Sequence, residues 1–195
     1  MTGKGGTIVS MDKPRLTVLA GPTAVGKGSV VQALRERHPE LVVSVSATTR
    51  SPRPGEVDDV HYLFKTDEEF DALVESGLML EWATVHGVHR YGTPAPPVDE
   101  ALKAGKPVLL EIDLDGARQV MKTRPDALFV FLAPPSWDEL VRRLVGRGTE
   151  DEEERARRLQ TAKVEMAAES EFDVTVTNDD LDDAITELAH LMGLE

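Results

Sequence analysis

Residues 16–37 read LTVLAGPTAVGKGSVVQALRER, and this stretch determines which class of fold the chain adopts. Leu16–Ala20 is a short apolar run that ends at a glycine, which is typical of a strand buried on both faces of a parallel sheet. A helix is expected from about Lys27 to Arg37, because apolar residues recur there at helical spacing and a proline follows shortly after. A buried strand, a glycine-rich turn and a helix in this order indicate an α/β fold.

The turn, GPTAVGKG at residues 21–28, meets seven of the eight positions of the phosphate-loop pattern G-x-x-x-x-G-K-[ST]. Glycines let backbone N–H groups curl around phosphate oxygens, Lys27 adds a point charge, and the helix N-terminus adds partial positive charge. A plain glycine-rich turn is the alternative, and the flanking strand and helix favour phosphate binding. The residues expected to bind a nucleoside triphosphate here are Gly21, Pro22, Thr23, Ala24, Val25, Gly26, Lys27, Gly28 and Ser29.

The eighth position of the pattern departs from the usual residue. Gly28 stands where a Ser or Thr hydroxyl normally meets Mg²⁺, and Ser29 follows one place later. Adenylate-kinase-like enzymes also carry GKG at this point, so the change does not argue against nucleotide binding. The magnesium contact stays open between Ser29 and other groups.

Further along the chain, strand-like runs at residues 108–112, 128–132 and 174–176 are each followed by a helical pattern. This alternation predicts a parallel sheet core flanked by helices. Two stretches interrupt it and are expected to be mobile insertions: residues 46–97, rich in Pro, Gly and aromatics, and residues 142–160, rich in charge. The expected organisation is a flexible tail at 1–14 and one domain at 15–195, whose core comprises residues 15–45, 98–141 and 161–195.

Composition limits the possible functions. The 195 residues fit one compact domain, and no apolar run approaches the roughly 20 residues needed to span a bilayer. The absence of cysteine removes disulfides and thiolate chemistry, and it favours a cytoplasmic setting. A net charge of −13 disfavours nucleic acid and anionic membranes as partners, so an anionic ligand must meet a local positive pocket.

Two segments of the first insertion carry candidate binding residues. In SATTRSPRPGEVDDVHYLF, Arg50, Arg53 and Tyr62 could grip a phosphate, although arginines in a proline-rich loop are often merely solvated. In LEWATVHGVHRYGT, a carboxylate at Glu81 could accept parallel hydrogen bonds from the N1–H and 2-amino groups of guanine, a pair that adenine lacks. The alternatives are an exposed helix-end acid for Glu81 and a packing role for Trp82 and Tyr91.

From about Leu16 onward, the chain resembles the guanylate kinase family. The similarity rests on several blocks in order: GPTAVGKG, SVSATTRSPRPGE, EWATVHGVHRYGT, LLEIDLDGA, FLAPPS, RRLVGRGTEDEEERARRL and VTNDDLD. The resemblance implies a P-loop parallel-sheet core, a GMP-binding insertion at 46–97 and a helical lid at 142–160. It also implies phosphoryl transfer from ATP to GMP with Mg²⁺, use of dGMP as a second acceptor, and no obligate protein partner.

The resemblance assigns roles residue by residue. The GMP phosphate would be held by Arg50, Arg53, Tyr62 and Tyr91, and the base by Ser46, Glu81, Thr93 and Asp113. The ATP site would add Arg143 and Asn178 to the phosphate loop, and the catalytic residues would be Lys27, Arg53, Arg147 and Arg158. Asp113 would also lie near the metal ion, with Ser29 as another possible metal contact.

Simpler readings exist for three of these residues. Asp113 follows a buried strand and could be a helix cap, and Asn178 could belong to a turn. Arg158 is spaced from Glu154 as an ordinary i,i+4 pair on a solvated helix. A lid residue can satisfy both readings, because it is exposed when open and catalytic when closed.

Two departures from the family pattern are visible. The segment between Gly87 and Tyr91 is one residue longer than in members with GNYYG, which leaves the pose of Arg90 open. His61 stands where many members carry Asp. Two rival functions are a catalytically inactive guanylate-kinase-like binding module, which would lack the phosphate loop or acceptor arginines, and a kinase for another acceptor such as ribose 1,5-bisphosphate.

Overall fold

The computed structural model describes residues 15–85, 87–145 and 152–195, so the predicted tail at 1–14 and the predicted lid residue Arg147 lie outside the described part. At its centre is a five-stranded sheet in the order β2-β7-β1-β8-β9, with every pairing parallel. The strands are β2 (Val42–Val43), β7 (Val108–Glu111), β1 (Leu16–Ala20), β8 (Leu128–Ala133) and β9 (Val174–Thr177). The strands predicted at β1, β7, β8 and β9 are confirmed, and the short edge strand β2 is an addition.

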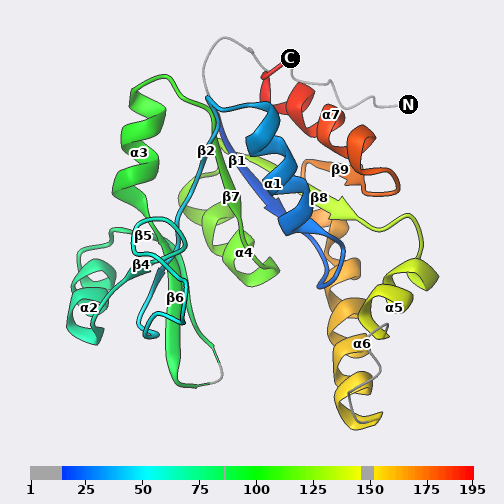
Figure 1. Cartoon of the computed structure of the whole chain (residues 1–195), viewed down its shortest axis with the longest axis horizontal. Coiled ribbons are helices and arrows are strands. Elements are labelled where there is room, and N and C mark those ends of the chain that lie inside the picture. Colours follow the sequence, from blue (N-terminus) through cyan, green and yellow to red (C-terminus); the bar gives the residue numbers. More distant parts are fainter. Residues whose placement is uncertain (1–14, 86, 146–151) are drawn as a thin grey trace, which may run out of the picture.

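Helices cover both faces of this sheet because the side chains of its central strand alternate between two apolar clusters. Leu19 packs with α1 (Lys27–Arg37) and α7 (Leu181–Met192) on one face. Val18 and Ala20 pack with α3 (Ala95–Lys103) and α4 (Leu114–Thr123) on the other. The predicted α/β class is therefore confirmed, and the phosphate loop connects β1 to α1 at the carboxyl end of the sheet (Figure 1).

A second, smaller sheet is built from residues of the first predicted insertion. Its order is β4 (Leu63–Phe64), β3 (Ala47–Thr48), β6 (His89–Pro94) and β5 (Met79–Val85), with α2 (Asp67–Glu75) inserted between β4 and β5. Helix α2 begins with a capping box, in which Thr66 and Glu69 satisfy each other's backbone N–H groups. Figure 1 shows this sheet and α2 on one side of the core, below the carboxyl ends of its strands.

On the opposite side, α5 (Trp137–Val145) and α6 (Glu152–Ala167) extend away from the core (Figure 1). Leu140, Leu144 and Ala162 form a small apolar cluster there, against which Ala24 of the phosphate loop packs. A short 3₁₀ turn, η1 (Glu169–Glu171), leads from α6 to β9. Helix α6 runs past residue 160, so the predicted change from lid to core does not coincide with a helix end.

In the ranges that the structure describes, no helix combines the length and the apolar character needed to cross a membrane.

Candidate active site

The phosphate loop is held open by tertiary contacts at one carbonyl. The Val25 oxygen accepts hydrogen bonds from Asn178 Nδ2 at 2.8 Å and Arg143 Nη1 at 3.1 Å, so two residues predicted for the ATP site meet here. Gly26 caps α1 with φ of 100°, and a Cβ at this position would lie 2.7 Å from Asn178 Nδ2. Glycine is therefore required here on both conformational and steric grounds.

Lys27 lies inside the loop, with Nζ donating to the Gly21 oxygen at 2.7 Å and the Pro22 oxygen at 3.4 Å. Burial lowers the pKa of Lys27, while the carboxylates of Glu165, Glu111 and Asp113 act in the opposite direction. Three carboxylates therefore act electrostatically on the Lys27 ammonium group, which lies in the predicted phosphate-binding turn.

Glu165 on α6 contacts the phosphate loop, and it was not among the site residues predicted from the sequence. Its two carboxylate oxygens accept from the Thr23 backbone N–H at 2.8 Å and from the Thr23 hydroxyl at 3.3 Å. This pair connects α6, the helix that begins within the predicted lid, directly to the phosphate loop. Its position in the lid-proximal helix carries no local signal, because only the tertiary packing brings α6 to the loop.

Glu111 was also missed, although an acid at the end of a strand beside the phosphate-loop strand is a recognisable signal. It pairs in register with Leu19 at the end of β7, and its Oε1 lies 3.9 Å from where a Cβ on Gly28 would stand. Burial raises the pKa of Glu111, and the nearby Lys27 charge partly offsets this. Ser29 is exposed close by in the first turn of α1.

The described ranges contain no group of three or more His, Asp or Glu side chains arranged to hold a metal ion.

Two of the predicted base-reading residues lie opposite each other in the second sheet. Thr93 on β6 pairs with Glu81 on β5, and Ser46 directly precedes β3, the strand that pairs with β6 on its other side. The Thr93 hydroxyl donates to Glu81 Oε1 at 2.7 Å. Glu81 is only 8% exposed and belongs to a strand, so the alternative of an exposed helix-end acid is wrong.

The first turn of α4 lies close to the Glu81 carboxylate. Asp113 caps α4 by accepting from the Gly116 N–H at 2.7 Å, which confirms the helix-cap reading. A Cβ on Gly116 would lie 3.1 Å from Glu81 Oε2 and 3.2 Å from Asp113 Oδ1, so two carboxylates converge on this position and a side chain there would be tightly packed against both. Burial, and to a lesser extent the Asp113 charge, raises the pKa of Glu81, although the hydrogen bond from Thr93 opposes this rise.

The predicted phosphate ligands form a second cluster on the same sheet. Arg50 Nε donates to the Tyr91 hydroxyl at 3.1 Å, and its guanidinium carbon lies 5.4 Å from the centre of the Tyr62 ring. The two tyrosine rings pack edge to face, with their centres 5.9 Å apart. Arg53 lies on the exposed loop nearby and contributes its backbone N–H, as described next.

Glu56 completes this cluster and was not assigned from the sequence, although it ends the RSPRPGE segment that contains both arginines. Its carboxylate binds Arg50 Nη1 and Nη2 at 2.9 Å each and accepts from the Arg53 N–H at 2.7 Å. These bonds, chiefly the one from Arg50, lower the pKa of Glu56 to about 2. The Arg50 guanidinium is therefore oriented by a fixed anion and a phenol.

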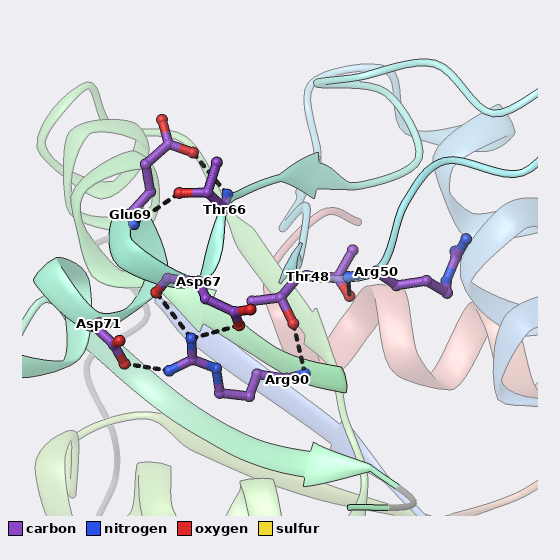
Figure 2. Close-up of polar contacts among 8 residues, drawn as sticks. Thr48, Arg50, Thr66, Asp67, Glu69, Asp71 and Arg90 are labelled. Carbon is purple, nitrogen blue, oxygen red and sulfur yellow. Dashed lines mark hydrogen bonds and ion pairs between the residues drawn. The ribbon is translucent and has the colours of Figure 1, made fainter. Parts of the chain in front are cut away.

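The position of Arg90, which the longer hairpin left open, is one that links β6 to α2. Figure 2 shows its guanidinium directed at Asp67 and Asp71 in the first two turns of α2. The guanidinium carbon of Arg90 lies 4.8 Å from the centre of the Phe70 ring. The Arg90 backbone N–H donates to Thr49 Oγ1 at 3.0 Å. Arg90 thus joins β3, β6 and α2, and Arg50 lies apart from this contact in the same view.

Two of the cavities border the phosphate loop. The larger, of about 580 Å³, lies between α1, β2 and the 60–61 loop, with Gly28 and Glu111 in its lining. A second, of about 290 Å³, lies between Thr23 and the α6 residues Glu154, Arg157, Arg158 and Thr161. The structure therefore brings the predicted lid residue Arg158 to the edge of the phosphate loop.

A parallel sheet with a phosphate loop after its first strand, bordered by two appendages that carry arginines, defines a P-loop nucleotide-binding protein. The Guanylate kinase family model matches residues 13–195. A guanylate kinase from Nocardia farcinica is 62% identical over 180 residues, covering 92% of this chain and 93% of the relative. One from Streptomyces coelicolor is 59% identical over 194 residues, covering 99% and 98%.

A solved structure agrees with these relatives. The crystal structure of guanylate kinase from Anaplasma phagocytophilum matches with a TM-score of 0.69 at 29% identity, covering 93% of this chain and 87% of that one. The chain belongs to the guanylate kinase family, whose activity is the ATP-dependent phosphorylation of GMP.

Proposed function

We propose that this chain transfers the γ-phosphoryl group of ATP to GMP, giving ADP and GDP, and that it also accepts dGMP. Recycling of guanine nucleotides in the cytoplasm is the proposed setting, without an obligate protein partner. The observation that carries the acceptor assignment is the buried Glu81 carboxylate, which Thr93 fixes at 2.7 Å opposite the first turn of α4. A buried carboxylate in a pocket needs N–H donors, and guanine offers two side by side.

Acceptor recognition would divide between the two clusters on the second sheet. Glu81, Thr93 and Ser46 would bind the base, while Arg50, Tyr62 and Tyr91 would bind the phosphate. Both clusters share one sheet face, because Tyr91 and Thr93 are two residues apart on β6. None of the proposed contacts involves the ribose 2′-hydroxyl, which is why dGMP is expected to react.

The donor would lie along the phosphate loop. Backbone N–H groups of residues 23–29, Lys27 and the N-terminus of α1 would hold its phosphates, with Arg143 and Asn178 fixing the loop through Val25. Mg²⁺ bound with ATP would neutralise charge on the β and γ oxygens. Glu111, Ser29 and Asp113 would hold this ion, directly or through water, and the half-buried Glu111, close to Lys27 and Gly28, fits such a charge.

Transfer would occur in line, with a GMP phosphate oxygen attacking the γ-phosphorus of ATP and ADP leaving. No protein nucleophile is needed, because the acceptor phosphate is already largely ionised at neutral pH. The protein's part would be positioning and positive charge, from Lys27 and Arg53 and, after lid closure, from Arg147 and Arg158. Closure would also exclude water, which would otherwise compete as the acceptor.

The test is release of ADP from Mg·ATP by the purified chain with GMP, dGMP, AMP, CMP, UMP or no acceptor. Turnover with GMP and dGMP alone is expected. Activity with another acceptor would retain phosphoryl transfer and overturn the role of Glu81. Inactivity with every acceptor would favour the binding-module alternative.

A further inference from the structure

We propose that Gln119 on α4 is a positioning residue for guanine recognition: it clamps the Trp82 peptide and thereby fixes the Glu81 carboxylate. This inference rests on the proposed role of Glu81 in reading the base. Gln119 belongs to no motif of the sequence and lies outside both clusters described above.

The clamp consists of two hydrogen bonds to one residue. Gln119 Oε1 accepts from the Trp82 N–H at 3.1 Å, and Gln119 Nε2 donates to the Trp82 carbonyl at 3.0 Å. One primary amide therefore satisfies both backbone groups of a residue that is far away in the chain. This is the pattern by which one strand binds its neighbour, supplied here by a helix side chain.

The clamp acts where the second sheet would otherwise end without a partner. Strand β5 is an edge strand, bonded on one side to β6. Its register with β6 is irregular between Met79 and Glu81, so sheet pairing alone fixes this point poorly. The Gln119 amide gives the open edge a partner on α4, a helix of the core.

Glu81 is held between two anchors as a result. On one side, Leu80 is buried in the apolar cluster that it shares with Ala117 and Val120 of α4. On the other side, Trp82 is bound by Gln119. The intervening side chain is thereby directed at the first turn of α4, where its Oε2 lies 3.1 Å from the position of a Cβ on Gly116.

Two parallel hydrogen bonds to guanine require the carboxylate to be held closely in both position and tilt. Without the clamp, β5 can shift or twist at its irregular point, and the carboxylate moves relative to Asp113 and α4. Loss of the clamp should therefore weaken recognition of the 2-amino group first, since both carboxylate oxygens must be aligned to use it.

The experiment compares Gln119→Met with the matched control Lys122→Met, which changes an exposed residue of the same groove beside Trp82 and Gln119. Steady-state kinetics are measured with GMP and with inosine 5′-monophosphate, which keeps N1–H and lacks the 2-amino group. Gln119→Met is expected to raise KM for GMP about 10-fold, to change kcat and KM for ATP little, and to reduce the preference for GMP over the inosine nucleotide. Lys122→Met should leave all of these values unchanged.

A double-mutant cycle with Glu81→Gln separates this inference from the function beneath it. If Gln119 acts through Glu81, Gln119→Met adds little in the Glu81→Gln background. Three results would each overturn the positioning role. The first is a full effect of Gln119→Met on KM in the Glu81→Gln background, and the second is an unchanged KM in the single variant. The third is an equal rise in KM for GMP and for ATP together with a lower Tm. An unchanged preference for GMP in Glu81→Gln alone would instead overturn the proposed role of Glu81.

Discussion

At the scale of single residues, the site depends on a carboxylate in an unfavourable environment. Glu81 is 8% exposed and lies near a second acid, Asp113, so its charge is neither well solvated nor neutralised by a cation in the described structure. Thr93 supplies one hydrogen bond. A guanine base would use the remaining hydrogen-bonding capacity of the carboxylate. Burial of this charge destabilises the free protein, and it favours a ligand that supplies two N–H donors.

Replacing Glu81 by Gln tests this point. The amide presents one acceptor and one donor where two acceptors are needed, so a donor of the base would face another donor. We expect KM for GMP to rise about 100-fold, in line with the loss of about 3 kcal/mol from two charge-assisted hydrogen bonds. Initial rates at varied GMP check this, with Glu100→Gln, on the exposed side of α3, as the control. Equal GMP affinity in wild type and Glu81→Gln would contradict the assignment.

The raised pKa of Glu81 predicts a pH dependence of GMP binding. Guanine binding needs the ionised carboxylate, so affinity should begin to fall at a higher pH than the ordinary glutamate pKa of about 4.5 would give. The GMP phosphate also titrates, so the informative quantity is the difference between the wild-type profile and that of Glu81→Gln. Identical profiles would show that Glu81 does not titrate with binding.

The same shift has a consequence for stability without ligand. Because the folded pKa is raised above the unfolded value, the group contributes stability below the unfolded pKa and loses it as pH rises through the folded pKa. At pH 7 the ionised Glu81 therefore costs stability, and Glu81→Gln should have a Tm at least equal to that of the wild type. The difference should shrink towards pH 4. A lower Tm for Glu81→Gln at pH 7 would argue against the pKa shift.

At the scale of elements, the second sheet depends on contacts that tie its short strands to helices. Strands β3 and β4 pair over two residues each, which is too little to fix them alone. Arg90 compensates by bonding Asp67 and Asp71 of α2 and by stacking on Phe70 (Figure 2). Its backbone also accepts from the Thr49 N–H and donates to the Thr49 hydroxyl. These contacts also help to position the cluster around Arg50, because its partner Tyr91 follows Arg90 directly in β6.

Arg90→Met should therefore lower the free energy of unfolding by about 1 to 2 kcal/mol. The estimate is modest because Asp67 and Asp71 are exposed, whereas the Arg90 side chain is only 17% exposed and stacks on a ring. Urea unfolding measures the change. Arg37→Met, which removes a surface pair with Asp182, should cost less than about 0.5 kcal/mol. An equal effect of the two variants would mean that Arg90 is an ordinary surface ion pair.

At the scale of the whole molecule, the phosphate loop lies between two appendages, the second sheet with α2 and the pair α5 and α6 (Figure 1). Each is linked to the loop or the core by identifiable contacts: Gln119 to Trp82 on one side, and Glu165 to Thr23 on the other. Helix α6 carries Arg158 near the loop, which is where a lid must bring positive charge when both substrates are bound.

Arg158→Ala is expected to lower kcat about 10³-fold while changing GMP affinity little, because its charge would act on the transferring phosphoryl group. Single-turnover rates and equilibrium binding of GMP distinguish the two effects. The neighbouring exposed Arg155 on the same helix provides the control variant Arg155→Ala. A loss of GMP affinity with kcat preserved would assign Arg158 to substrate binding instead of to the transfer step.

Features that depend on local sequence pattern could be predicted before the structure was known. The apolar run of Leu16–Ala20, the glycine-rich turn and the helix Lys27–Arg37 have the boundaries that their periodicity and punctuation predict. The order of several such blocks was enough to indicate the family. Glu81 and Thr93 could be named from their blocks, although the strand that carries Glu81 and the burial of its carboxylate could not.

How these residues meet depends on tertiary packing. Hydrogen-bond register between β5 and β6 places Glu81 opposite Thr93, and helix docking brings Gln119 and Glu165 to their partners. No periodicity encodes such pairings, because they join segments far apart in the chain and depend on which strand lies beside which. Burial, which raises the pKa of Glu81, is likewise a property of the packed molecule and not of the residue.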